Sequence, residues 1–149
     1  IALESGNNMF NKILVVCVGN ICRSPTGEAL LKKYSKSKQI SSAGIAALVG
    51  RDAAELAKEV AAENGVEIVG HIATQLTMEL CQENELILVM EKEHIDKVCH
   101  IAPEARGKIM LFGHWNSQEI PDPYKRSKET FEQVYRMLDA AAVAWSKKI

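Results

Sequence analysis

Four short segments of the chain have the pattern of strands, of which three are strongly apolar and the second, residues 40–43, is weaker. Longer segments in which apolar residues recur at helical spacing separate them. The first of them, residues 13–18, reads Ile-Leu-Val-Val-Cys-Val and has no alternation of apolar and polar positions. An unbroken apolar run of this length is typical of a parallel strand that is buried on both faces. We therefore predict four strands, at residues 13–18, 40–43, 86–90 and 109–112.

Helices are predicted between and after these strands. The last one carries apolar residues at helical spacing from Phe131 to Trp145, so that one of its faces is apolar. The helix over residues 52–64 is predicted to open on a capping box formed by Asp52 and Glu55. The helices are expected at residues 25–37, 52–64, 76–82 and 93–100, and from residue 127 onward.

The alternation of strands with helices determines the expected fold class. It indicates βαβ units, which form a parallel sheet with right-handed crossovers. We predict a three-layer αβα fold of the α/β class around a four-stranded parallel sheet. Residues 1–8 depart from the pattern ahead of Met9, and we interpret them as a cloning remnant. Residues 9–149 then form a single domain, because this length suits one core and no linker or repeat interrupts it.

The most informative feature of the sequence is the junction at the end of the first strand. Residues 19–23, Gly-Asn-Ile-Cys-Arg, connect this strand with Ser24-Pro25, which is predicted to start a helix with Ser24 as its N-cap. Backbone N–H groups of a short loop at a helix N-terminus can converge on one anion. Cys17 before this loop and Arg23 at its end therefore predict a site that binds and cleaves a phosphate ester.

The loop residues have distinct predicted roles. The helix N-terminus, the loop amides and Arg23 favour the thiolate form of Cys17, and Ser24 is placed to donate its hydroxyl to the sulfur. The planar fork of Arg23 can grip two phosphate oxygens at once. Gly19 allows the backbone to approach the ligand, and Asn20 tolerates left-handed backbone angles. The predicted phosphate-binding loop comprises Val18, Gly19, Asn20, Ile21, Cys22, Arg23 and Ser24.

The segment Val16–Pro25 and the later triplet Asp122-Pro123-Tyr124 resemble the two signatures of low-molecular-weight protein-tyrosine phosphatases. The resemblance extends over nearly the whole chain from Met9, and it is closest to the bacterial branch that is encoded beside capsule and exopolysaccharide genes. It implies the flavodoxin-like fold of these phosphatases. The chain departs from several eukaryotic members in having Lys125 where they carry a second aromatic residue.

Asp122 lies between two prolines in this triplet region. Because a phenolate is a poor leaving group, its expulsion needs a positioned proton donor. We expect Asp122 to be this general acid, since the prolines stiffen the loop and remove amide donors that would stabilise the ionised carboxylate. Glu119 is the next candidate. In the expected mechanism Cys17 attacks phosphorus, Arg23 and the loop amides hold the oxygens, and the phosphocysteine is then hydrolysed. This mechanism requires neither a metal nor a cofactor.

A deep slot with apolar walls would select phosphotyrosine over shorter phosphorylated side chains. Tyr124 is predicted to form one wall. The segment 45–49 after the second strand, with Ala47 and Leu48, is the candidate for the other wall by position and by resemblance, and simple packing of a loop is the alternative. Cys22 is expected to form a reversible disulfide with the nucleophile under peroxide, as opposed to being a purely structural thiol.

Charge and composition exclude several other functions. The net charge of −1 gives no electrostatic basis for binding nucleic acid or an acidic membrane. The four cysteines are sparse and lack CxxC spacing, which argues against a zinc ribbon and favours a reducing, cytoplasmic location. The histidines form no ligand-like pair, although His71 is a candidate to support the loop network. Methionines expected in the core are Met78, Met90, Met110 and Met137.

The resemblance also implies a partner, namely a phosphotyrosine protein such as the C-terminal tail of a bacterial tyrosine autokinase in polysaccharide production. Only this substrate would bring the protein to a membrane. One alternative is a thioredoxin-linked arsenate reductase, which shares the fold and the loop but relays a disulfide through two closely spaced cysteines. Cys81 and Cys99 are separated by a predicted strand, which disfavours that relay. A catalytically silent phosphotyrosine-binding module is the other alternative, and the intact Cys17, Arg23 and Asp122 disfavour it.

Overall fold

The structure is a computed structural model that describes residues 9–149, so the interpretation of residues 1–8 as a cloning remnant lies outside the described residues. Four parallel strands form one sheet in the order β2-β1-β3-β4. All four predicted strands are confirmed, and no strand end differs from its prediction by more than one residue. The strands are β1 (Lys12–Cys17), β2 (Gln39–Gly44), β3 (Leu86–Val89) and β4 (Ile109–Leu111).

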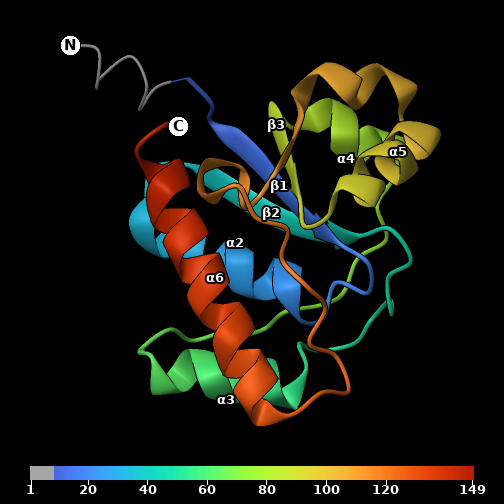
Figure 1. The fold of residues 1–149 in the computed structure, drawn as a ribbon. Coiled ribbons are helices and arrows are strands. Elements are labelled where there is room, and N and C mark those ends of the chain that lie inside the picture. Colours follow the sequence, from blue (N-terminus) through green and yellow to red (C-terminus); the bar gives the residue numbers. More distant parts are fainter. Residues whose placement is uncertain (1–8) are drawn as a thin grey trace.

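Helices cover both faces of this sheet (Figure 1), which confirms the three-layer αβα prediction. Two short 3-10 helices, η1 and η2, flank β4 and were not predicted. The helices α2 (Arg23–Tyr34), α3 (Glu55–Glu63) and α6 (Lys128–Ser146) lie on one face, α4 (Met78–Glu83) and α5 (Lys92–Ile101) lie on the other, and the short helices are η1 (Pro103–Lys108) and η2 (His114–Asn116).

Successive residues of β1 face opposite layers of the molecule. Ile13 and Val15 pack into the core beneath α2, α3 and α6, whereas Leu14 and Val16 pack into the core beneath α4 and α5. All four side chains are completely buried, and each contributes roughly 1.5–3 kcal/mol of hydrophobic stabilisation. The absence of alternation in this segment therefore follows from the presence of helices on both sides.

A close approach of α2 to the sheet places the N-terminus of this helix beside the end of β1. A Cβ atom on Gly27 would lie 3.2 Å from the ring of Phe112 and 3.2 Å from the side chain of Val15, so the absence of a side chain permits this packing. The indole N–H of Trp145 in α6 donates to the carbonyl of Phe112 at 2.8 Å. These contacts hold α6, α2 and the sheet together behind the loop that follows β1.

Three predicted helix starts are wrong. α4 begins at Met78, two residues after its predicted start, with Thr77 as its N-cap. α2 begins at Arg23 with Cys22 at the N-cap position and without a side-chain cap, because the hydroxyl of Ser24 is directed to the sulfur of Cys17 instead. Pro25 is consequently the third helical residue, a first-turn position in which proline is tolerated.

The predicted capping box at the start of α3 does not form either. The N-cap residue is Ala54, which has no side-chain acceptor. Asp52 instead accepts a hydrogen bond from the N–H of Ala53 at 2.7 Å and binds Lys58 at 2.7 Å. The core prediction also fails for Met78, which is 42% exposed at the start of α4. Among residues 9–149, no helix has both the length and the apolar character needed to cross a membrane.

Candidate active site

A cavity of about 200 Å³ opens at the carboxyl end of β1. Three segments contribute to it: the loop between β1 and α2, the segment after β2, and the loop before α6. A larger hollow of about 400 Å³ lies between α2 and residues 67–72, but it contains none of the predicted catalytic side chains. The smaller cavity is lined by Cys17, Val18, Gly19, Ile21, Cys22, Arg23, Ala46, Leu48, Asp122 and Tyr124.

Cys17 is the last residue of β1, and its side chain lies at the base of this cavity with 2% exposure. Its sulfur is 2.9 Å from the hydroxyl oxygen of Ser24 in the first turn of α2. Because Ser24 belongs to the first turn of α2, the positive end of this helix lies beside the sulfur. The end of β1, the first turn of α2 and the loop between them therefore all lie beside the thiol of Cys17.

A hydrogen-bond network determines the direction of the Ser24 hydroxyl. The side-chain oxygen of Asn20 accepts from the N–H of Thr74 at 2.8 Å, so the amide nitrogen of Asn20 is the atom that faces the two serines. This nitrogen donates to Ser24 at 2.7 Å and to Ser42 at 3.0 Å. Because Ser24 accepts from Asn20, its own proton is available for the sulfur of Cys17, which stabilises the thiolate.

A second layer of residues supports this network. The hydroxyl of Ser42 donates to Glu28 at 2.6 Å, and the ring Nε2 of His71 lies 2.6 Å from the carbonyl oxygen of Asn20. The structure thus confirms that His71 contacts the loop. Ser42, Glu28 and Thr74 were not predicted, because no motif of the sequence distinguishes them.

The loop conformation depends on two backbone features. Asn20 has φ of 59°, the left-handed conformation that its sequence position predicted. A Cβ atom on Gly44 would lie 2.5 Å from the carbonyl oxygen of Val18, so only glycine fits where the end of β2 passes this loop. The N–H groups of Ala46 and Leu48 donate to the carbonyls of Val18 and Gly19, both at 3.0 Å, and so tie the following segment to the loop.

Arg23 is 2% exposed although its guanidinium is charged. Its Nη1 donates to the carboxylate of Glu91 at 2.5 Å and to the carbonyl of Ile120 at 2.8 Å. Its Nη2 lies 3.9 Å from the carboxylate of Asp122. Glu91 was not predicted as a site residue. It lies two residues after the end of β3, the strand beside β1, so its place near the carboxyl end of a neighbouring strand was the signal that could have identified it.

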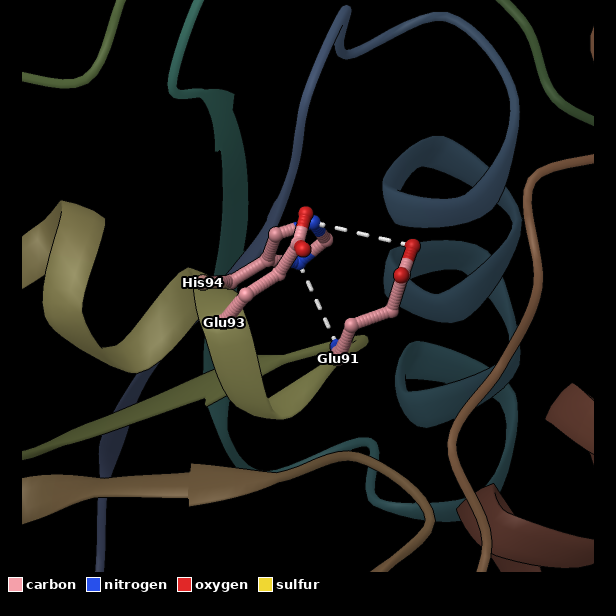
Figure 2. Close-up of side chains that lie close together, drawn as sticks. All are labelled: Glu91, Glu93 and His94. Atoms are coloured by element: carbon pink, nitrogen blue, oxygen red, sulfur yellow. Dashed lines mark hydrogen bonds and ion pairs between the residues drawn. The ribbon is translucent and has the colours of Figure 1, made fainter.

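Glu91 is also the N-cap of α5 and forms a capping box with His94. Figure 2 shows their side chains turned toward each other, with Glu93 nearby. Within the described part of the chain these three residues are the one group whose ligand atoms lie close enough together to hold a metal ion. Because Glu91 already binds Arg23 and the ring of His94 accepts from the Glu91 N–H, we assign the cluster a role in hydrogen bonding.

Asp122 reaches the cavity with a carboxylate that is half exposed. The expectation that its loop lacks amide donors is wrong in one respect, because the N–H of Tyr124 donates to Asp122 at 3.0 Å. The preceding residues fix the loop: the N–H of Ile120 donates to the carbonyl of Met90 at 2.9 Å. Glu119 accepts from the N–H of Lys92 at 2.9 Å and does not line the cavity.

The cavity walls are largely those expected. Leu48 and Tyr124 line the cavity, but Ala46 lies on it in place of Ala47. The N–H of Ala47 donates to the side chain of Gln75 at 3.0 Å, whereas those of its two neighbours face the phosphate-binding loop. The wall is therefore formed by Ala46 and Leu48, whose N–H groups bond to the phosphate-binding loop, and Ala47 is turned toward Gln75 instead.

The second cysteine of the loop, Cys22, lines the same cavity as Cys17. Burial raises the pKa of Cys22 to about 12, with contributions from Cys17 and Asp122, while Arg23 acts in the opposite direction. Cys22 is therefore a protonated thiol at neutral pH. Cys81 and Cys99 do not line the cavity and are buried in the core beneath α4 and α5, on the other face of the sheet.

The parallel sheet and the loop with Cys17 and Arg23 at its carboxyl end are those of a small α/β phosphatase. The family model described as "Low molecular weight phosphotyrosine protein phosphatase" matches residues 12–149. The chain belongs to this family, and the predicted enzyme class, a phosphoric monoester hydrolase, is confirmed.

Relatives narrow the position of the chain within the family. It is 54% identical over 142 residues to the low molecular weight protein-tyrosine-phosphatase Wzb of Escherichia coli K12, covering 95% of this chain and 97% of the relative. The structure of Vibrio vulnificus Wzb in complex with benzylphosphonate superposes with a TM-score of 0.93 at 56% identity, covering 94% and 99% of the two chains. The predicted bacterial branch is thereby confirmed.

A more distant structure shares the fold with a different named activity. The YwlE arginine phosphatase from Geobacillus stearothermophilus superposes with a TM-score of 0.87 at 31% identity, covering 93% of this chain and 92% of that one. The fold is therefore shared by proteins named as phosphatases of different phosphorylated side chains.

Proposed function

We propose that this chain hydrolyses phosphotyrosine in proteins through a phosphocysteine intermediate. The observation that carries the proposal is the convergence of Cys17, Arg23 and Asp122 on one cavity, with the hydroxyl of Ser24 2.9 Å from the sulfur. A nucleophile, an anion-binding fork and a proton donor are the groups that cleavage of an aryl phosphate needs.

The proposed reaction has two chemical steps. In the first, the thiolate of Cys17 attacks phosphorus while Arg23 and the loop N–H groups hold the non-bridging oxygens, and Asp122 protonates the departing tyrosine oxygen. In the second, Asp122 accepts a proton from the water that hydrolyses the phosphocysteine. Positioning and charge stabilisation supply most of the acceleration, as in other phosphoryl transfers.

Selectivity for phosphotyrosine follows from the walls of the cavity. Leu48 and Tyr124 present apolar surface on which an aromatic ring can pack, and the phosphate must reach the sulfur at the base. The benzylphosphonate complex of Vibrio vulnificus Wzb concerns a ligand of this shape, an aromatic ring joined to a phosphonate. A phosphoserine side chain is shorter, so its phosphate would not reach the loop without bringing the peptide backbone into the cavity.

The physiological substrate that we propose is the C-terminal tail of a tyrosine autokinase in bacterial polysaccharide production. Support comes from the resemblance of the chain to the capsule-associated branch, which its similarity to Wzb proteins strengthens. We place the enzyme in the cytoplasm, where such a tail would be dephosphorylated, and we expect it to approach the membrane only through this substrate.

We further propose that Cys22 protects the nucleophile from oxidation. Both cysteines line the same cavity, and oxidation of Cys17 to a sulfenic acid would allow Cys22 to close a disulfide that a thiol can reduce. Because Cys22 is protonated in the resting enzyme, it would not compete with Cys17 as a nucleophile.

A panel of matched peptides tests the substrate proposal. One sequence is prepared with phosphotyrosine, phosphoserine, phosphothreonine or phosphoarginine at the same position, and phosphate release is measured for each. We expect kcat/KM for the phosphotyrosine peptide to exceed the others by at least about two orders of magnitude. Cys17→Ser should abolish release, whereas Cys99→Ser, outside the cavity, should retain it. Preferred hydrolysis of phosphoarginine would overturn the substrate class.

A further inference from the structure

His94 is a buried titratable side chain that the proposed reaction does not use. It is 1% exposed and is the third residue of α5. Its ring lies against Glu91 (Figure 2). Glu91 is the residue whose carboxylate accepts from the guanidinium of Arg23. The contacts of this ring connect it to the phosphate-binding machinery through one intervening side chain.

The orientation of Arg23 depends on two acceptors of different rigidity. The carbonyl of Ile120 is part of a backbone that is itself bonded to Met90 at 2.9 Å. The carboxylate of Glu91 stands at the end of a side chain with three rotatable bonds, so it needs contacts of its own to stay in place. A displaced carboxylate would let the guanidinium turn away from the phosphate.

His94 supplies contacts to both ends of Glu91. The ring Nδ1 of His94 accepts from the backbone N–H of Glu91 at 3.2 Å, and the backbone N–H of His94 donates to the Glu91 carboxylate. The ring Nε2 lies 3.7 Å from the Glu91 oxygen that binds Arg23. Because Nδ1 is an acceptor, the proton of the neutral ring is on Nε2 and faces the carboxylate.

The charges around the ring favour this neutral form. Burial lowers the pKa of His94, and Arg23 from α2 lowers it further, as does Lys97. The carboxylates of Glu91 and Glu93 act in the opposite direction. A protonated ring would lose the Nδ1 acceptor and with it the bond to the Glu91 N–H.

We propose that His94 is a positioning residue for the phosphatase reaction: its ring fixes the carboxylate of Glu91, and Glu91 in turn aims the guanidinium of Arg23 at the phosphate. This proposal rests on the proposed function. His94 touches no reacting atom, so its effect on the rate passes entirely through Glu91.

Two substitutions separate this role from the capping of α5. His94→Asn retains an acceptor near the place of Nδ1 but has no group at the place of Nε2. His94→Gln can place its amide nitrogen near the position of Nε2 but loses the capping acceptor. Glu93→Gln, at the exposed neighbouring residue of the same helix, is the matched control.

The readouts are kcat and KM for p-nitrophenyl phosphate, the dissociation constant of vanadate, and the melting temperature. We expect His94→Asn to lower kcat/KM about tenfold and to weaken vanadate binding, with little change in melting temperature. His94→Gln should stay within about threefold of wild type in kcat/KM while melting earlier. Wild-type kinetics in His94→Asn, or losses of activity that follow the melting temperature in both variants, would overturn the proposal.

A double-mutant cycle tests whether the effect passes through Glu91. In a Glu91→Ala background, and in Glu91→Gln if the alanine variant fails to fold, His94→Asn should cause no further loss of kcat/KM. A second full tenfold loss in both backgrounds would show that His94 acts by another route. If the wild type hydrolysed no phosphotyrosine, the proposed function would fail, but the vanadate affinities would still decide the role of His94.

Discussion

Removal of the Glu91 carboxylate should destabilise the protein by more than any exposed ion pair could explain. Arg23 is 2% exposed, and its closest anionic partner is Glu91 at 2.5 Å. In Glu91→Ala the guanidinium would keep the carbonyl of Ile120 at 2.8 Å and the half-exposed carboxylate of Asp122 at 3.9 Å. The variant would therefore leave a buried cation with incomplete compensation.

The size of the effect can be worked from these contacts. Breaking a buried ion pair by removing one partner costs about 3–5 kcal/mol. Glu91 is 29% exposed, so water can replace part of its interaction, and we take about 2–3 kcal/mol for this contribution. Loss of the α5 cap adds about 1 kcal/mol. The free energy of unfolding should fall by about 3–4 kcal/mol, and the melting temperature by roughly 6–16 °C.

Urea and thermal unfolding followed by circular dichroism measure this change directly. Glu93→Ala is the matched control, because Glu93 is a neighbouring carboxylate of the same helix that is 66% exposed and lies 3.6 Å from Lys97. Its removal should cost less than about 0.5 kcal/mol. If Glu91→Ala and Glu93→Ala were equally stable, Arg23 would not depend on Glu91 and the reasoning would be refuted.

Three further predictions concern the acid, the second thiol and pH. Asp122→Asn should slow the burst phase strongly for phenyl phosphate but much less for aryl phosphates whose phenols have low pKa values, and an unchanged leaving-group dependence would place the acid elsewhere. After peroxide treatment, dithiothreitol should restore the wild type more fully than Cys22→Ser; equal recovery would remove the protective role. The folded state holds the pKa of His94 below 6.5, its value in the unfolded chain. Between these two pKa values the folded protein therefore binds fewer protons than the unfolded chain. The stability that His94 contributes is therefore complete above pH 6.5 and declines as the pH falls toward the folded pKa. Denaturant titrations at several pH values should show that the free energy of unfolding of His94→Asn declines less with falling pH than that of the wild type. Parallel declines in the two proteins would contradict this prediction.

The strands could be predicted because their chemistry is local. The two central strands, β1 and β3, are covered by helices on both faces and are apolar throughout their buried positions, and residues 13–16 are all completely buried. The edge strand β2 gave a weaker signal, since it contains two serines. The phosphate-binding loop was equally accessible, since its functional groups are consecutive in the sequence and lie between a strand end and a helix start. The positions of Cys17 and Arg23 on either side of one short loop could therefore be predicted from the order of the residues alone.

The helix starts were less predictable because a polar side chain can serve only one partner at a time. Ser24 is of a residue type that is common at N-caps, yet its hydroxyl bonds to the sulfur of Cys17 at 2.9 Å. Asp52 has the spacing of a capping box, yet it binds Lys58 at 2.7 Å. The sequence pattern shows which hydrogen bonds a polar side chain is able to form, whereas the tertiary structure determines which partner it binds.

Residues brought in from distant segments could not be assigned without the order of the strands. Glu91 binds Arg23 because β3 lies beside β1, and Thr74 meets Asn20 because the chain returns past the end of β2. Ala46 lines the cavity in place of Ala47 because the N–H groups of Ala46 and Leu48 bond to the phosphate-binding loop, whereas that of Ala47 bonds to Gln75. Each of these features depends on contacts between segments far apart in the sequence.

Direct detection of the phosphoenzyme tests the central claim that Cys17 is the nucleophile of a tyrosine phosphatase. The wild type is mixed with a phosphotyrosine peptide, quenched within the burst phase, digested and examined by mass spectrometry. We predict one phosphoryl group on the peptide that contains Cys17, at a level that rises with the burst and is absent from Cys17→Ser. Turnover of the peptide with no phosphorylated enzyme, or with the phosphoryl group on another residue, would contradict the claim.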